Sequence, residues 1–158
     1  MSHVINPSHV ARVMKEKGIS AKKSLGQNFL IDQNIVRRIV ESADLQGEHW
    51  VVEIGPGLGA LTAPMAEAAA QVVAMEIDRE LVAILQEALA HPKISIVEGD
   101  ALELDWRAVL EERGWRGEPL SLVANLPYYI TTPLIMKALE SGLPFAAVLV
   151  MVQKEVAD

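Results

Sequence analysis

The chain has 158 residues, of which 51% are apolar and 22% are charged, and its formal net charge at pH 7 is −7. These values are ordinary for a single globular α/β domain, and the absence of cysteine excludes disulfides and thiolate metal sites. No metal site of another kind is predicted. Charged residues interrupt the amino terminus, and the apolar run at residues 143–152 is too short to span a bilayer, so we expect a cytoplasmic protein without a membrane partner.

The charge is unevenly distributed along the chain. Residues 1–38 carry seven Lys or Arg against two acids, a balance of +5, so the remaining 120 residues carry −12. A basic segment attached to an acidic domain can engage phosphate backbones. An amphipathic helix with ordinary surface lysines explains the same charges, and charge alone leaves both alternatives open.

The elements predicted near the amino terminus are helices. Helical spacing at residues 10–17 is followed by a loop, and Asp32 can cap a second helix. The apolar positions of that second helix are Ile35, Ile39 and Val40, which we expect to face the core. We treat residues 1–46 as a basic helical arm.

Strands and helices alternate from residue 47 onward. The predicted strands are residues 50–54, 71–77, 94–97, 121–124 and 146–152, and the predicted helices are residues 61–70, 79–90, 106–113 and 132–140. This alternation predicts an α/β core over residues 47–158, built as a mostly parallel sheet with helices on both faces. The nearly continuous apolar runs of the strands agree with burial on both faces.

A glycine-rich turn, residues 53–59 (EIGPGLG), follows the first predicted strand. Glycines at such a turn let a ligand approach the backbone closely. Gly55, Gly57 and Ala60 also fit the loose pattern of dinucleotide-binding enzymes. Glu76, at the end of the second strand, suits a ribose diol in a dinucleotide or in another nucleoside cofactor, because a carboxylate accepts from both hydroxyls.

The acid at the start of this turn argues against a dinucleotide. Glu53 places a negative charge close to where a pyrophosphate would lie, which is unfavourable for a dianion and acceptable for an ammonium group. S-adenosylmethionine carries an ammonium and a sulfonium and no phosphate. Asp100, at the end of the third strand, is then placed to accept from the adenine amine, and Ile77 can pack on the ring. A role for Asp100 as a helix cap is compatible with this.

Asn125, Leu126, Pro127 and Tyr128 directly follow the predicted strand at residues 121–124. They are therefore expected at the carboxyl end of a strand, where open α/β sheets bind ligands. The Asn125 side-chain oxygen and the Leu126 carbonyl can accept hydrogen bonds from an exocyclic amine. Pro127 stiffens the turn and Tyr128 offers a face for stacking a base. A strand followed by an ordinary turn explains the same four residues.

Six segments carry the strongest pattern in the sequence: residues 22–30 (KKSLGQNFL), 53–62 (EIGPGLGALT), 76–78 (EID), 99–102 (GDAL), 125–134 (NLPYYITTPL) and 152–157 (VQKEVA). Together and in this order they resemble the ribosomal RNA adenine dimethyltransferase family. The resemblance implies a Rossmann-like fold that uses S-adenosylmethionine to dimethylate the N6 amines of two adjacent adenosines near the 3′ end of 16S rRNA. The implied partner is 16S rRNA in the small ribosomal subunit or its precursor.

The same resemblance implies a role for each matching residue. The implied cofactor site consists of Gln27, Asn28, Leu30, Gly55, Glu76, Ile77, Asp100, Ala101 and Asn125. The implied catalytic residues are Asn125, Leu126, Pro127 and Tyr128, with Tyr128 stacking on a base that has left its helix. No general base is required, because the methylated cationic amine is acidic.

Members of this family continue beyond the segment that residues 152–157 match. We therefore expect a fragment whose sheet stops after the fifth strand and which lacks a carboxyl-terminal helical domain. The exposed strand at residues 146–152 is then expected to pair with another copy of the chain. Two other functions remain open: a nicotinamide-dependent dehydrogenase, and a catalytically silent module that binds RNA or the ribosome.

Overall fold

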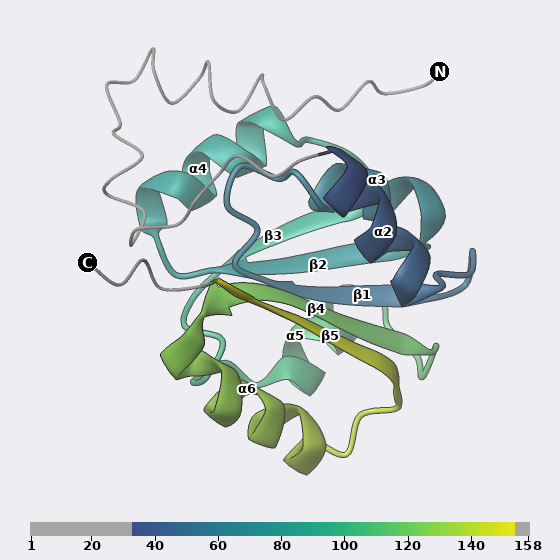
Figure 1. Cartoon of the computed structure of the whole chain (residues 1–158), viewed down its shortest axis with the longest axis vertical. Coiled ribbons are helices and arrows are strands. Elements are labelled where there is room, and N and C mark those ends of the chain that lie inside the picture. Colours follow the sequence, from purple (N-terminus) through teal and green to yellow (C-terminus); the bar gives the residue numbers. More distant parts are fainter. Residues whose placement is uncertain (1–32, 154–158) are drawn as a thin grey trace.

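The computed structural model describes residues 33–153, which form a five-stranded parallel sheet with helices on both faces (Figure 1). The strands are β1 (Trp50–Ile54), β2 (Gln71–Glu76), β3 (Ile94–Glu98), β4 (Leu120–Pro127) and β5 (Phe145–Gln153). The helices are α2 (Gln33–Ala43), α3 (Thr62–Ala68), α4 (Arg79–Ala88), α5 (Trp106–Glu112) and α6 (Tyr128–Glu140). None of these helices is both long and apolar enough to cross a membrane.

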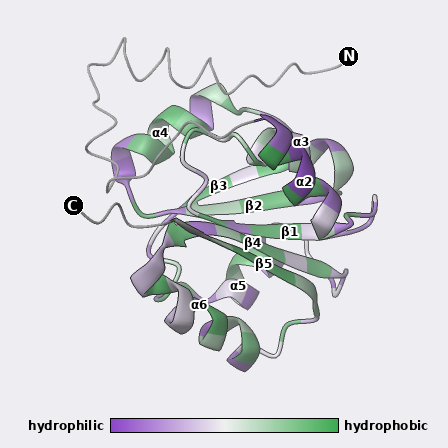
Figure 2. Ribbon diagram, viewed as in Figure 1, coloured by the Kyte–Doolittle hydropathy of each residue, from purple (hydrophilic) through white to green (hydrophobic). Residues whose placement is uncertain are grey.

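The sheet separates two hydrophobic layers. Helices α2, α3 and α4 cover one face, and α5 and α6 cover the other (Figure 1). Successive strand residues alternate between the layers: Val51 packs with α2 and α3, whereas Val52 packs with α5 and α6, and both are fully buried. Burial of both strand faces explains why the strands are hydrophobic along most of their length, as Figure 2 shows.

The order of the strands creates one switch point in the sheet. Across the sheet the order is β3-β2-β1-β4-β5, so the chain first builds outward from β1 to β3 and then returns to add β4 on the other side of β1. In open parallel sheets the connections after two such strands leave toward opposite faces and open a crevice between them. The carboxyl ends of β1 and β4 therefore mark the expected ligand site.

One predicted core position in α2 was wrong. Ile35 is 49% exposed, whereas the buried residues of the helix are Val36, Ile39 and Ala43. These three follow a spacing of three and four residues, which places them on a single helix face. Val40 is half-buried, and the predicted cap Asp32 lies outside the described residues.

The predicted junction between the fourth strand and the next helix was also wrong. Strand β4 continues to Pro127 instead of ending at residue 124, and α6 begins at Tyr128 instead of residue 132. Pro133 lies inside α6, although proline has no backbone N–H and is therefore favoured in the first turn of a helix and not in its interior. The strand therefore passes directly into the helix, and Asn125 belongs to the strand. The other predicted elements of the core agree with the structure to within two residues at each end.

Candidate active site

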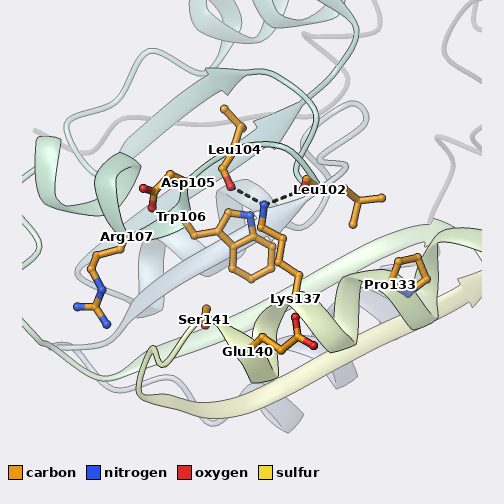
Figure 3. A pocket seen from close by; sticks show the side chains of 9 residues that line it. All are labelled: Leu102, Leu104, Asp105, Trp106, Arg107, Pro133, Lys137, Glu140 and Ser141. Atoms are coloured by element: carbon orange, nitrogen blue, oxygen red, sulfur yellow. Dashed lines mark hydrogen bonds between the residues drawn. The ribbon is translucent and has the colours of Figure 1, made fainter.

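A cavity of about 460 Å³ lies at the carboxyl ends of the strands. Four segments line it: the turn after β1, the end of β2, the loop after β3 and the junction of β4 with α6. The cavity thus occupies the edge of the sheet where the switch point lies. A second hollow of about 510 Å³ adjoins it, and Leu102 and Pro133 line both (Figure 3).

The structure brings most of the predicted site residues of the core to this cavity. Those that line it are Gly55, Glu76, Ile77, Asp100, Ala101, Leu126 and Pro127. Asn125 and Tyr128 belong to the same junction, but neither lines the cavity. The predicted site residues Gln27, Asn28 and Leu30, and most of the basic arm, lie outside the described residues.

The glycine turn after β1 has an unusual backbone conformation and contributes one residue to the wall of the cavity. Gly55, Gly57 and Gly59 all have a positive φ, of 73°, 58° and 83°, a conformation that favours glycine. A Cβ atom at Gly59 would also lie 2.6 Å from the Leu89 side chain. Of the three, only Gly55 lines the cavity. A ligand is therefore expected to approach the backbone closely at Gly55, whereas Gly57 and Gly59 allow the chain to form the turn.

Glu76 presents an unsatisfied oxygen in the wall of the cavity. The residue is only 3% exposed, and its Oε2 accepts a hydrogen bond from the backbone N–H of Asp78 at 2.9 Å. Its Oε1 is buried and has no hydrogen-bond partner within the described structure. Burial raises the pKa of Glu76 above its ordinary value. A ligand hydroxyl that donated to Oε1 would remove the cost of this unpaired acceptor.

Glu53 lies in the interior of β1, close to Glu76, and does not line the cavity. It is 2% exposed and accepts a hydrogen bond from the Thr62 hydroxyl at 2.5 Å. Burial raises the pKa of Glu53 to about 7, and the negative charge of Glu76 contributes to the rise. The Thr62 bond acts in the opposite direction, since it stabilises the carboxylate.

The raised pKa of Glu53 predicts a pH-dependent stability. The folded state holds this proton up to about pH 7, whereas the unfolded chain releases it near its ordinary value of 4.5, so stability falls as pH rises between these values. We expect Glu53→Gln, which has no charge to bury, to be more stable than the unaltered chain at pH 8 by on the order of 3 kcal/mol and to have no such advantage at pH 4.

Urea unfolding at both pH values measures this difference. Glu67→Gln, on the exposed surface of α3, is the matched control and should show no pH-dependent gain. An advantage of Glu53→Gln that is equal at both pH values would contradict the explanation.

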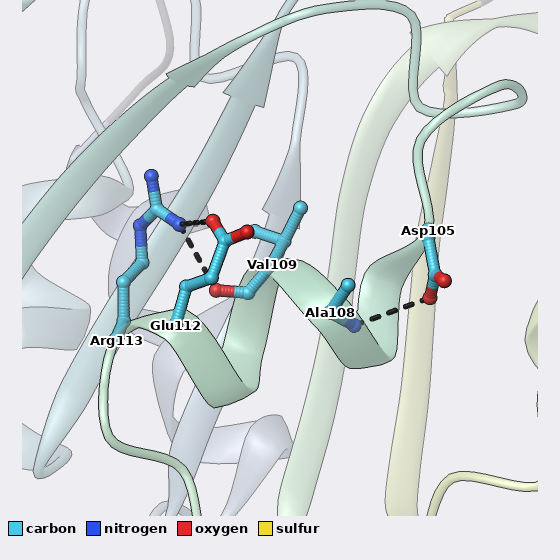
Figure 4. A network of polar contacts seen from close by, with 5 residues as sticks. All are labelled: Asp105, Ala108, Val109, Glu112 and Arg113. Carbon is cyan, nitrogen blue, oxygen red and sulfur yellow. Dashed lines mark hydrogen bonds and ion pairs between the residues drawn. The ribbon is translucent and has the colours of Figure 1, made fainter.

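Asp100 caps a turn and not a helix. Its Oδ1 accepts from the backbone N–H of Leu102 at 2.9 Å, while the cap of α5 is Asp105, which accepts from the N–H of Ala108 at 3.1 Å (Figure 4). The interpretation of Asp100 as a helix cap was therefore wrong. The turn holds the half-buried Asp100 carboxylate at the cavity wall, where the site prediction requires it.

The β4–α6 junction exposes two aromatic rings. Tyr128 is 67% exposed and Tyr129 is 69% exposed, and Tyr129 lines the cavity. Leu126 is buried in the cavity wall, and Asn125 beside it is half-buried. Leu126 and Tyr129 line the cavity, and Asn125 and Tyr128 adjoin them in the chain, so the junction beside the cavity carries an amide, a backbone carbonyl and exposed aromatic faces, groups suited to a planar group bearing an amine.

Some cavity residues were missed by the sequence prediction. On α6 these are Tyr129, Ile130 and Pro133, and Met75 was missed on β2. The spacing of Tyr129 and Pro133, four residues apart, places them on one face of α6. The sequence prediction did not recognise this spacing, because it expected the helix to begin at residue 132 and so left Tyr129 outside it.

The fold and this cavity define a Rossmann-like methyltransferase domain. Similar solved structures include the 23S rRNA methyltransferase ErmE, with 32% identity and a TM-score of 0.67 over 81% of this chain and 49% of that chain. A dimethyladenosine transferase from Plasmodium falciparum has 27% identity and a TM-score of 0.64 over 80% of this chain and 43% of its own.

A sequence model of the family described as ribosomal RNA adenine dimethylase matches residues 18–158, and the chain belongs to this family. It is 46% identical over 156 residues to ribosomal RNA small subunit methyltransferase A of Shouchella clausii, and 48% identical over 156 residues to the protein of that name from Bacillus pumilus. Each alignment covers 98% of this chain and 53% of the relative, so the chain spans about half the length of these relatives. Membership of the family rules out the nicotinamide-dependent dehydrogenase.

Proposed function

We propose that this domain binds S-adenosylmethionine and transfers its methyl group to the N6 amines of two adjacent adenosines near the 3′ end of 16S rRNA. The observation that carries the cofactor assignment is the unpaired Oε1 of Glu76 in the cavity wall, which fits a ribose hydroxyl. The names of the relatives, methyltransferases of small-subunit ribosomal RNA, support the reaction. Since 16S rRNA is made and assembled in the cytoplasm, the proposed location is cytoplasmic.

The other cavity residues fit the remaining parts of this cofactor. Gly55 would lie under the methionine portion, and its lack of a side chain leaves room there. Ile77 is 52% exposed at the cavity, and its apolar surface would be covered by the adenine ring. Asp100 and Ala101 would border the base, with the Asp100 carboxylate accepting from its amine. Gln27, Asn28 and Leu30 are proposed to border the cofactor from the amino-terminal arm.

The proposed chemistry depends on positioning. When bound, S-adenosylmethionine supplies an electrophilic methyl group on a sulfonium. The amine of adenine is a poor nucleophile, because its lone pair is delocalised into the ring. The Asn125 side-chain oxygen and the Leu126 carbonyl would accept the two amine hydrogens and direct the lone pair at the methyl carbon. The N–C bond would form as the methyl C–S bond breaks, which would leave the thioether S-adenosylhomocysteine. The proton of the methylated amine would then pass to water or to a nearby carbonyl.

Two side chains of the junction would hold the target base. Tyr128 would stack on the flipped adenine, and Pro127 would keep the junction rigid. The large exposure of the Tyr128 ring supports this role, because a ring that waits for a base must be accessible.

Calorimetry with S-adenosylhomocysteine and with NAD tests the cofactor assignment. We expect saturable binding of S-adenosylhomocysteine and none of NAD, because the described lining of the cavity carries two acids, Glu76 and Asp100, and no lysine or arginine, which disfavours a pyrophosphate. Binding of NAD in place of S-adenosylhomocysteine would overturn the proposal.

We also propose that the 158-residue chain self-associates through β5. In the described sheet β5 is an edge strand, and its Val148 is 41% exposed. An apolar edge offers unpaired backbone groups to a second copy. Light scattering at increasing concentration should show a dimer or larger species, and Val148→Lys should reduce it because a charge on an edge strand opposes pairing. A strictly monomeric unaltered chain at high concentration would contradict this.

A further inference from the structure

The loop between β3 and α5 forms one wall of the cavity, through residues 99–102. It is a compact turn: the N–H groups of Glu103 and Leu104 both donate to the Asp100 carbonyl, at 2.9 Å each. The turn directs several carbonyls away from its own backbone, and these need donors from elsewhere. The Trp106 indole N–H supplies one of them, donating to the Ala101 carbonyl at 2.8 Å.

Lys137 supplies donors for two more of these carbonyls. Its Nζ donates to the Leu102 carbonyl at 2.8 Å and to the Leu104 carbonyl at 2.5 Å, as Figure 3 shows. The same ammonium lies 5.6 Å from the centre of the Trp106 ring, within the range of a cation–π interaction. Two hydrogen bonds to the loop and one ring contact with the first residue of α5 thus hold this partly buried lysine of α6 against a segment more than thirty residues earlier in the chain.

We propose that Lys137 is a positioning residue for the adenine end of the cofactor site. It acts by clamping the loop that carries Asp100 and Ala101. This inference rests on the proposed function, because it presumes that the base of the cofactor lies against that loop. Lys137 lines the adjoining hollow and not the main cavity, so its effect on a ligand passes through the loop.

The position of Lys137 on α6 also connects the β3–α5 loop with the β4–α6 junction. The helix begins at Tyr128, next to the proposed acceptor residues, and Lys137 lies about two and a half turns further along. Because α6 is hydrogen-bonded to the β3–α5 loop through Lys137, the helix keeps that loop and the β4–α6 junction in one arrangement. Pro133, between these two points, lines both the cavity and the hollow.

Replacing Lys137 by methionine tests the clamp. Lys137→Met keeps the length and the apolar contact with Trp106 but leaves the Leu102 and Leu104 carbonyls without their donor. We expect calorimetry to show about tenfold weaker binding of S-adenosylhomocysteine. Adenosine, which lacks the amino-acid portion, should lose affinity by the same factor, because in the proposed site the loop would contact only the base. Lys137→Arg, which retains several donors, should restore most of the affinity.

Lys93→Met is the matched control. Lys93 Nζ also donates to a backbone carbonyl, that of Ala69 at 3.3 Å, but neither residue lines the cavity. We expect Lys93→Met to bind both ligands as the unaltered chain does, even where it lowers the melting temperature. Should Lys137→Met fail to fold, Lys137→Gln, with one shorter amide donor, should show an intermediate loss.

The outcomes separate this inference from the proposed function. If the unaltered chain did not bind S-adenosylhomocysteine, the proposed function and the role of Lys137 would both be overturned. If the unaltered chain and Lys137→Met bound it equally well, the role of Lys137 alone would be overturned. Equal losses in Lys137→Met and Lys93→Met would also overturn it, since they would reflect general destabilisation.

Discussion

Replacing Asn125 by alanine should abolish most of the methyl transfer and leave part of the cofactor binding. The substitution removes the side-chain oxygen that would hold one hydrogen of the target amine, and the rate should fall about 10²–10³-fold, as for other preorganised polar groups that act on the reacting atoms. Because Asn125 does not line the cavity, the affinity for S-adenosylhomocysteine should fall much less than the rate. Single-turnover transfer and calorimetry measure the two effects separately.

Asn125→Asp provides the comparison. It keeps an oxygen acceptor of the same size at the end of β4 and should therefore retain more activity than Asn125→Ala. Turnover near the unaltered level in Asn125→Ala would show that this residue does not orient the amine, and the assignment of the acceptor site would fail.

Replacing Glu76 by alanine should weaken cofactor binding about 100-fold, because the ribose would lose its hydrogen bonding to the Glu76 carboxyl group, whose Oε1 is the unpaired acceptor. The ligand-free chain should lose much less, since Oε1 has no partner within the described structure and burial already disfavours the carboxylate. A large loss of ligand affinity together with a small loss of stability would identify Glu76 as a residue that binds the ligand.

The structure offers a matched control for Glu76→Ala on the neighbouring strand. Glu98 is the register partner of Glu76 on β3 and is exposed. Glu98→Ala should therefore bind S-adenosylhomocysteine with unchanged affinity in calorimetry. A similar loss in both variants would mean that charge at the end of the sheet, and not contact with the ribose, determines binding.

The core of the fold could be predicted because its strands are buried on both faces. Val72 and Val73 of β2 are apolar for the same reason, although they face opposite layers. The continuous apolar run at residues 72–75 therefore identifies a strand without an alternating pattern. Polar residues at the carboxyl ends of such strands, Glu76 and Asp100, then predict one shared site, and both line the cavity.

The features that escaped prediction depend on tertiary packing. Pro133 is tolerated inside α6, and this shifted the predicted start of the helix and concealed Tyr129. Ile35 is apolar and exposed, which periodicity over a short helix does not reveal. The contacts of Lys137 join residues 33 and 35 positions apart, and no local pattern indicates them.

The most direct test of the proposed function is a transfer assay with tritium-labelled S-adenosylmethionine on undermethylated small ribosomal subunits. We expect the unaltered chain to place label on N6-dimethyladenosine near the 3′ end of 16S rRNA, and Asn125→Ala to place almost none. A chain that binds S-adenosylhomocysteine and the subunit but transfers no label would contradict the proposal and favour a catalytically silent module that binds RNA.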